Sequence, residues 1–154
     1  MRNLCVLAGG VLLVLGLTGC PQDSNSDKSK QEAAMSDSVK ILSEYADAIE
    51  SVKDKQTGME AAAKINKCCD KMEELAATTS KLPKVKNKAD FEKFLEAKVV
   101  PEMDKILKRA TKEKVASAVV LCGGEESFQK AMERWQPAFN KLLSAQKQMA
   151  GGNR

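Results

Sequence analysis

The chain has 154 residues, of which 43% are hydrophobic, 30% charged and only 4% aromatic, with five cysteines and no histidine. The length fits one globular domain, and the net charge of +4 is too small to indicate nucleic-acid binding. Without histidine the chain cannot form a Ser-His-Asp or Cys-His catalytic constellation, a histidine-bearing zinc or di-iron site, or a histidine-ligated haem site. It also lacks a glycine-rich phosphate loop and a G-x-S-x-G motif, so we expect neither an enzyme nor a cofactor.

The first twenty residues have the anatomy of an export signal. Met1-Arg2-Asn3 carries one positive charge, and an apolar run from Leu4 to Leu17 follows. This run is shorter than the ~20 residues that a membrane-spanning helix needs, so it is typical of a cleaved signal peptide. It ends in Leu17-Thr18-Gly19-Cys20, an aliphatic residue, two small residues and a cysteine, which resembles the lipobox of bacterial lipoproteins.

The resemblance to bacterial lipoproteins implies a specific set of modifications. Residues 1–19 would be removed, the Cys20 sulfur would carry diacylglycerol, and the new amino group would carry an acyl chain such as palmitate. Several acyl chains give stable anchoring, whereas one gives only marginal binding. The implied protein is anchored in the cell envelope and faces the periplasm. Pro21 and Gln22 follow the cysteine in place of the aspartate that retains many lipoproteins at the inner membrane, which favours the outer membrane.

Residues 20–35 are predicted to hold the lipidated Cys20 and a flexible tether, and residues 36–150 the folded domain. The first half of the tether is rich in Ser, Asp, Asn and Lys and has no apolar residue to bury. The last residues, 151–154, contain two glycines and should fray.

Two amphipathic helices should open the domain as an antiparallel hairpin. The first is predicted over residues 36–54, because Ser36 can cap it and apolar residues recur at three-four spacing from Val39. The second should begin at Thr57-Gly58-Met59-Glu60, which fits a capping box, and should stop before Pro83. The predicted link between them, Lys55-Gln56, is too short for any arrangement other than an antiparallel hairpin.

Two further helices should complete the bundle. The third is predicted from Asn87, with a kink or local break at Pro101. After Thr111 its apolar pattern changes phase, which fits either a continuation or a separate short helix. The fourth is predicted over residues 125–149, and Pro137 should interrupt it as Pro101 interrupts the third.

Charge is unevenly distributed along the domain. Residues 31–80 carry a net charge of −4 and residues 81–114 a net charge of +5. Either the two segments pack against each other with the charges at the border, or the molecule associates with a second copy in an antiparallel manner. The connection from Lys81 to Lys88 contains four lysines and no acid, so it is either a solvated loop or a contact for anionic lipid headgroups.

Three cysteines remain in the domain, Cys68, Cys69 and Cys122. Thiols outside the cytoplasm tend to pair. Three interpretations stay open: buried core residues, a disulfide from Cys68 or Cys69 to Cys122, and a thiol-based metal or redox site. The adjacent pair lacks the C-x-x-C spacing of redox and zinc sites, so no metal site is expected.

The sequence therefore predicts an all-α protein, an antiparallel bundle of about four main helices behind a signal peptide and a tether. Its segment 52–62 is similar to small helical envelope lipoproteins of bacteria, a resemblance that implies no activity. The favoured function is a lipid-anchored structural or protein-interaction module, with the membrane, an envelope protein or a second copy as partner. The alternatives are a thiol-based carrier of a small ligand or metal and an enzyme that works without histidine.

Overall fold

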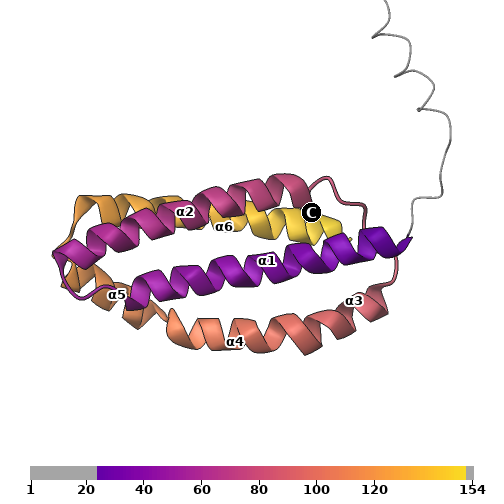
Figure 1. Ribbon diagram of the computed structural model, residues 1–154, viewed down its shortest axis with the longest axis horizontal. Coiled ribbons are helices and arrows are strands. Elements are labelled where there is room, and N and C mark those ends of the chain that lie inside the picture. The colour runs from indigo at the N-terminus through magenta and orange to yellow at the C-terminus, as the bar shows by residue number, and fades with distance from the viewer. Residues whose placement is uncertain (1–23, 152–154) are drawn as a thin grey trace, which may run out of the picture.

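The computed structural model describes residues 24–151, and this part of the chain is an all-α antiparallel bundle without a β-strand (Figure 1). Three of its four rods are the long helices α1 (Ser24–Glu50), α2 (Lys55–Thr79) and α6 (Glu126–Met149). The fourth rod is built of shorter pieces, which are α3 (Lys88–Phe94), the π-helical turn η1 (Leu95–Val99), α4 (Val100–Arg109) and α5 (Lys112–Leu121). The predicted fold class is confirmed.

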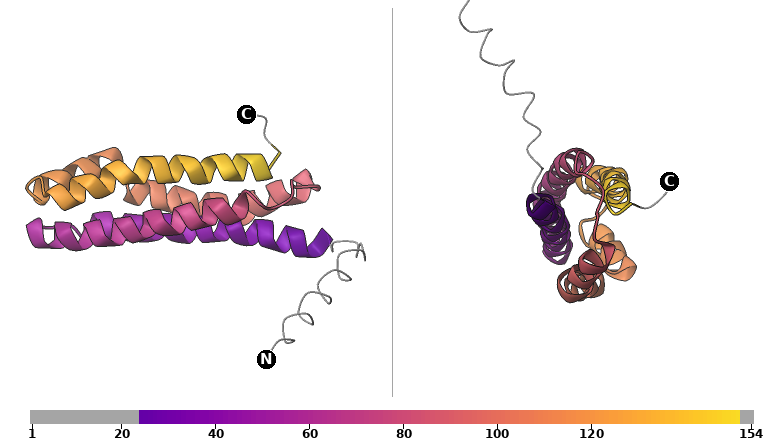
Figure 2. Two further views of the ribbon diagram at one scale, coloured as in Figure 1. Left: turned by 90° about the horizontal axis from the view of Figure 1, so that it is seen from above. Right: turned by 90° about the vertical axis from the view of Figure 1, so that its right-hand side faces the viewer.

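The rods lie side by side (Figure 2). α2 packs against both α6 and α1, and α1 contacts α4 and α5. We call the end that holds the start of α1, the α2–α3 connection and the end of α6 the proximal end. The distal end holds the α1–α2 turn and the α5–α6 turn. An ion pair of 3.3 Å between Lys55 and Glu125 joins these two turns.

One apolar core runs through the bundle. Ile65, Met72, Phe128 and Leu142 are among its fully buried residues, and they come from α2 and α6. Trp135 of α6 stacks on Tyr45 of α1 with ring centroids 3.6 Å apart, so the aromatic pair joins the two helices that flank α2. Burial of large apolar side chains of this kind is the main favourable term in folding.

The predicted tether is wrong for residues 24–35, because α1 begins at Ser24 and not at Ser36. This part of α1 has few apolar residues, which is why the sequence resembles a linker. Nevertheless Gln31 and Ala34 are buried, and Gln31 Nε2 donates a hydrogen bond of 2.8 Å to the Pro83 carbonyl oxygen. The hydrogen bond to the α2–α3 connection and the burial of Ala34, rather than a continuous apolar stripe, therefore order the first turns of the helix.

The start of α2 also differs from the prediction, because α1 ends at Glu50 and the predicted link Lys55-Gln56 lies inside α2. Asp54 is the N-cap, and its side chain accepts a hydrogen bond of 2.8 Å from the Thr57 amide, while the Thr57 hydroxyl accepts one of 2.9 Å from the Asp54 amide. The capping box is thus Asp54 to Thr57, three residues before the predicted one. Gly58 consequently lies inside the helix and is buried.

The two predicted proline interruptions have different outcomes. Before Pro101 the chain forms η1, where the Val100 amide bonds to the Leu95 carbonyl five residues back, so the helix has widened just before the residue that lacks an N–H. A second break follows at Ala110, and α5 starts afresh with Thr111 as its N-cap. The predicted interruption at Pro137 is wrong, because α6 continues through this exposed position.

Candidate functional site

The α2–α3 connection is fixed to the proximal end by backbone and side-chain contacts. Besides the bond from Gln31 to Pro83, the Val85 amide donates a hydrogen bond of 2.9 Å to the Met149 carbonyl at the end of α6. Val85, Phe91 and Met149 form a small second apolar cluster beneath the connection. The connection therefore has a defined position although it contains no regular secondary structure.

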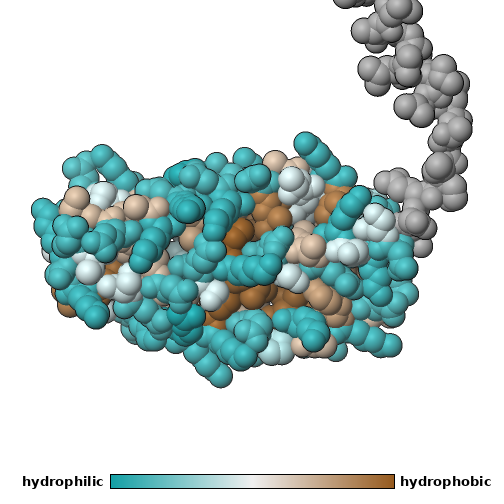
Figure 3. All heavy atoms as spheres, viewed as in Figure 1, coloured by the Kyte–Doolittle hydropathy of each residue, from teal (hydrophilic) through white to brown (hydrophobic). Residues whose placement is uncertain are grey.

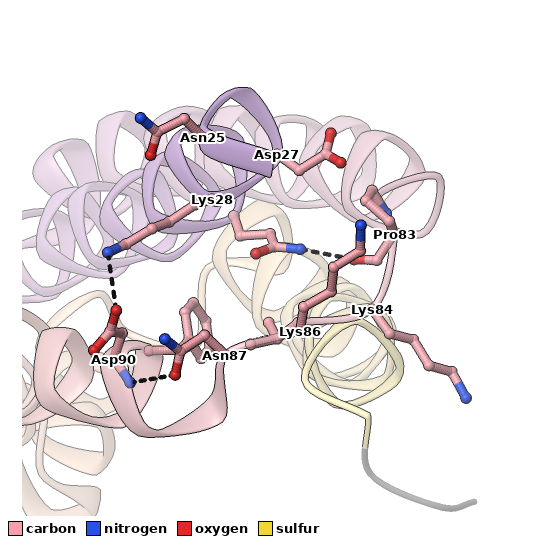
Figure 4. A pocket seen from close by; sticks show the side chains of 11 residues that line it. Asn25, Asp27, Lys28, Pro83, Lys84, Lys86, Asn87 and Asp90 are labelled. Carbon is pink, nitrogen blue, oxygen red and sulfur yellow. Dashed lines mark hydrogen bonds and ion pairs between the residues drawn. The ribbon is translucent and has the colours of Figure 1, made fainter. Parts of the chain in front are cut away.

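A cavity of about 220 Å³ opens between the first turns of α1 and the α2–α3 connection (Figure 4). Lys28 of α1 pairs with Asp90 of α3 across it at 3.6 Å, and the Asn87 side chain accepts a hydrogen bond of 3.2 Å from the Asp90 amide. Lys84 and Lys86 also line the cavity. Figure 4 shows the Lys84 side chain extending away from it.

Three exposed lysines of this connection and the first residue of α3, also an exposed lysine, form a cluster that we call the loop lysines. They are Lys81, Lys84, Lys86 and Lys88. No ion pair between residues 24 and 151 includes any of them. Asp27 and Asp90 are the acids that line the neighbouring cavity, and Asp90 is already paired with Lys28. The proximal end thus presents a basic surface.

The sequence identified the loop lysines, but it did not place them in the molecule. The structure brings them beside the first turns of α1, which is the part of the domain closest along the chain to the predicted lipidation residue Cys20. Cys20 itself lies outside the described residues. Sequence reasoning missed Lys28, since it fell in the predicted tether. No local sequence pattern indicated that Lys28 pairs with Asp90 across the cavity.

The distal end has a different character, because large apolar side chains are exposed there. Val120 and Leu121 of α5 are 77% and 49% exposed, and Met59 of α2 is 46% exposed. Met59 is close to the end of α5, since the adjacent Gly58 packs directly against Cys122. Exposed apolar residues that lie together are typical of protein contact surfaces.

The three domain cysteines are free thiols, and all are buried. Burial, reinforced by Glu44, raises the pKa of the Cys68 thiol to about 11, and burial also raises the pKa of Cys69. Such thiols stay protonated at neutral pH and are poor nucleophiles and metal ligands. Among the described residues there is no group of three or more acidic or cysteine side chains placed to hold a metal ion.

The second interpretation of the cysteines, a disulfide from Cys68 or Cys69 to Cys122, does not fit this geometry. The Cα atom of Cys122 lies 3.6 Å from the position that a Cβ atom on Gly58 would occupy. Cys68 and Cys69 are ten and eleven residues further along α2, which is about 15 Å or more along the helix axis. A disulfide requires Cα atoms within about 7 Å, so neither Cys68 nor Cys69 can reach Cys122 in the folded bundle.

Ion pairs cross from the acidic hairpin to the basic segment, as the first interpretation of the charge distribution predicted. Arg109 at the end of α4 pairs with Asp47 and, at 2.7 Å, with Glu50 of α1, and Lys114 of α5 pairs with Glu50 at 3.2 Å. These contacts lower the pKa of Glu50, with the hydrogen bond from Arg109 as the largest cause. The opposite charges therefore border the contact between α1 and the fourth rod.

A shallow groove of about 310 Å³ runs between α1 and α2. Ile41 and Leu75 provide its apolar part, and Lys71 and Glu44 pair across its edge at 2.5 Å. Figure 3 shows apolar atoms at the surface of this face of the bundle between bands of polar side chains. The groove brings together no set of catalytic or metal-binding side chains.

Comparison of the chain with protein-family models, with curated proteins and with solved structures finds no match. Between residues 24 and 151, no helix combines the length and the apolar character that crossing a bilayer requires.

Proposed function

We propose that the chain is a lipoprotein of the bacterial envelope, anchored through acyl chains on Cys20, whose helical bundle acts as a structural or protein-interaction module in the periplasm. The sequence basis is the signal segment and the lipobox Leu17-Thr18-Gly19-Cys20. The Pro21-Gln22 pair after the cysteine favours the outer membrane as the site of anchoring.

The observation that carries the proposal is the short distance along the chain between the anchor and the bundle. Ser24, where α1 begins, is four residues after Cys20. Four residues span at most about 14 Å in any conformation, so an acylated Cys20 would hold the proximal end close to the bilayer. α1 has 27 residues, a length of about 40 Å, and this length separates the distal end from the anchor.

The exposed apolar side chains support an interaction role for the end remote from the anchor. Met59 lies in the first turns of α2, and Val120 and Leu121 lie in the last turn of α5, where they would be accessible to another envelope protein. A module of this kind needs no catalytic constellation, and binding energy would come from burial of these side chains in the contact.

Lipid attachment is tested by metabolic labelling with a clickable fatty acid. The wild-type protein should incorporate label, and Cys20→Ser should incorporate none. Cys68→Ser is the matched control and should label like the wild type, because its thiol is buried in the core. Incorporation of label by Cys20→Ser would overturn the anchoring proposal.

The interaction role is tested with a photo-crosslinking amino acid in living cells. Placed at Val120, it should yield a crosslinked species with another envelope protein. Placed at Lys105, an exposed position on α4, it should not. Equal yields at both positions, or none at either, would argue against a contact at the distal end and leave the result on lipid attachment unaffected.

A further inference from the structure

We infer that the loop lysines form a second, electrostatic membrane contact, so that the proximal end of the bundle lies directly on an anionic bilayer rather than being held away from it. This inference rests on the proposed anchoring at Cys20. It goes beyond that anchoring because it gives the domain a fixed orientation, with a face that binds lipid headgroups.

The first argument is position. Lys28, about one helical turn after the start of α1, pairs with Asp90 of α3, and Gln31 binds Pro83. The α2–α3 connection therefore lies within about 10 Å of the level at which α1 begins. The chain between Cys20 and Ser24 spans at most about 14 Å, so an acylated Cys20 keeps the loop lysines near the headgroup region.

The second argument is charge. The four loop lysines are exposed and make no ion pair with any residue from 24 to 151. Residues 81–88 contain no acid, and of the two acids in the adjacent cavity Asp90 is paired with Lys28, which leaves Asp27 as the opposing charge. A basic cluster beside a lipid anchor adds affinity for anionic lipid, and the attraction acts only within a Debye length of about 8–10 Å.

The third argument is rigidity. The connection is tied to α1 by the Gln31 bond, to α6 by the Val85–Met149 bond, and to the bundle by the buried side chains of Val85 and Phe91. The lysines are therefore presented on an ordered surface. Because the same surface carries the start of α1, binding of both the acyl chains and the lysines would direct the distal end away from the bilayer.

The test uses the acylated protein in two kinds of vesicle, one of phosphatidylcholine and one of phosphatidylcholine with phosphatidylglycerol. Lysines are modified with an uncharged acylating reagent, which the anionic surface does not repel, and their reaction rates are measured by mass spectrometry. An anionic surface concentrates protons about threefold and lowers the unprotonated fraction of a nearby lysine by the same factor. The loop lysines should thus react about threefold more slowly on anionic vesicles, and high salt should abolish the difference.

Internal controls and a variant pair complete the design. Lys53 and Lys112 are exposed at the distal end and should react equally on both vesicles. In Lys84→Gln/Lys86→Gln the difference in reaction rate of Lys81 and Lys88 between the two vesicles should become smaller. In Lys53→Gln/Lys112→Gln this difference should be the same as in the wild type.

Two results would overturn the inference. In the first, the loop lysines react equally on both vesicles while the protein stays bound to them; anchoring would then be intact. In the second, lysines at both ends are slowed alike. A protein without acyl chains, detected by the mass of its N-terminal peptide, would instead contradict the proposed function.

Discussion

At the scale of single residues, Gly58 shows how a small side chain fixes a helix contact. Glycine inside a helix costs about 1 kcal/mol relative to alanine, yet Gly58 lies in the first turns of α2. A Cβ atom there would be 2.5 Å from the Cβ atom of Cys122, so only glycine lets the end of α5 approach this closely.

We therefore predict that Gly58→Ala lowers the free energy of unfolding by about 1–3 kcal/mol, in spite of the better helix propensity of alanine. Because the overlap is with a Cβ atom, Cys122→Gly should relieve the effect, whereas Cys122→Ala should not. Urea denaturation of the single and double variants measures this coupling. An unchanged cost of Gly58→Ala in the Cys122→Gly background would contradict the assigned contact.

The cap of α2 predicts how stability depends on pH. Hydrogen bonds from the Thr57 amide and hydroxyl lower the pKa of Asp54 below its ordinary value of 3.8. A carboxyl with a lowered pKa in the folded state adds stability above its unfolded pKa and loses it as the pH falls through the folded pKa. The stability difference between the wild type and Asp54→Asn should hence shrink below pH 3.8.

Chemical denaturation from about pH 6 to about pH 2 measures this difference. Thr57→Val removes the hydroxyl donor but keeps the backbone amide, so it should weaken the pH dependence without eliminating it. A wild-type to Asp54→Asn difference that stays constant over the whole range would contradict the cap.

At the scale of secondary-structure elements, the first part of α1 is the clearest test of the fold. Ala33 and Ala34 are neighbours, but Ala33 is exposed and Ala34 is 6% exposed. A flexible tether would tolerate a charge at either position. A packed helix would not, because an unpaired charge at Ala34 loses its hydration.

We predict that Ala34→Asp lowers the free energy of unfolding by about 1–3 kcal/mol, whereas Ala33→Asp changes it by less than about 0.5 kcal/mol. The two variants have the same composition and nearly the same helix propensity, so each controls for the other. Thermal unfolding followed by far-UV circular dichroism measures both. Equal stability of the two would restore the tether interpretation for this segment.

The prolines show that one residue type acts differently in two elements. Pro101 follows η1 near the start of α4, where a missing N–H is tolerated. Pro137 lies inside α6, where it leaves the Glu133 carbonyl without its usual partner four residues on. α6 is nevertheless continuous, since Trp135, Ala138 and Leu142 on either side of the proline are buried in the core. Tertiary packing overrides the local preference.

At the scale of the whole molecule, the free energy of unfolding should depend mainly on burial of the main core. The ion pairs at the border of the core should contribute little. Ile65 is fully buried and Trp135 is 8% exposed, and both belong to the main core. Arg109 is partly exposed and joins α4 to α1 through ion pairs with Asp47 and Glu50 and a long hydrogen bond to the Ser43 hydroxyl. Exposed pairs of this kind contribute little.

Ile65→Asp and Trp135→Asp should each unfold the bundle, because each places an unpaired charge in the core. Arg109→Gln should cost less than about 1 kcal/mol. Far-UV circular dichroism and, except in the tryptophan variant, the Trp135 fluorescence should change together in a single transition. A helical spectrum for Ile65→Asp at room temperature would contradict the core assignment.

The sequence alone determined the all-α class and the approximate extent of α2 and α6, although not the start of α1. The reason is that apolar residues at three-four spacing require a buried stripe wherever the helix packs. It also indicated the antiparallel first hairpin, although the link is residues 51–54 and not the predicted Lys55-Gln56. The break after Ala110, as one of two outcomes, and the cluster of loop lysines could be read from the sequence as well. The lipobox is equally a local signal, and its consequences remain a prediction. These features depend on residues close together in the chain.

Tertiary structure decided the rest. α1 extends back to Ser24 because Gln31 bonds to Pro83 of the α2–α3 connection, 52 residues away in sequence, and because Ala34 is buried in the bundle. Cys122 lies against Gly58, and about 15 Å of α2 separates Gly58 from Cys68. The thiols of Cys122 and Cys68 are therefore far apart. The loop lysines lie at the proximal end only because the hairpin of α1 and α2 returns the chain to the end where α1 begins. Contacts between segments distant in sequence set these distances, and no local pattern encodes them.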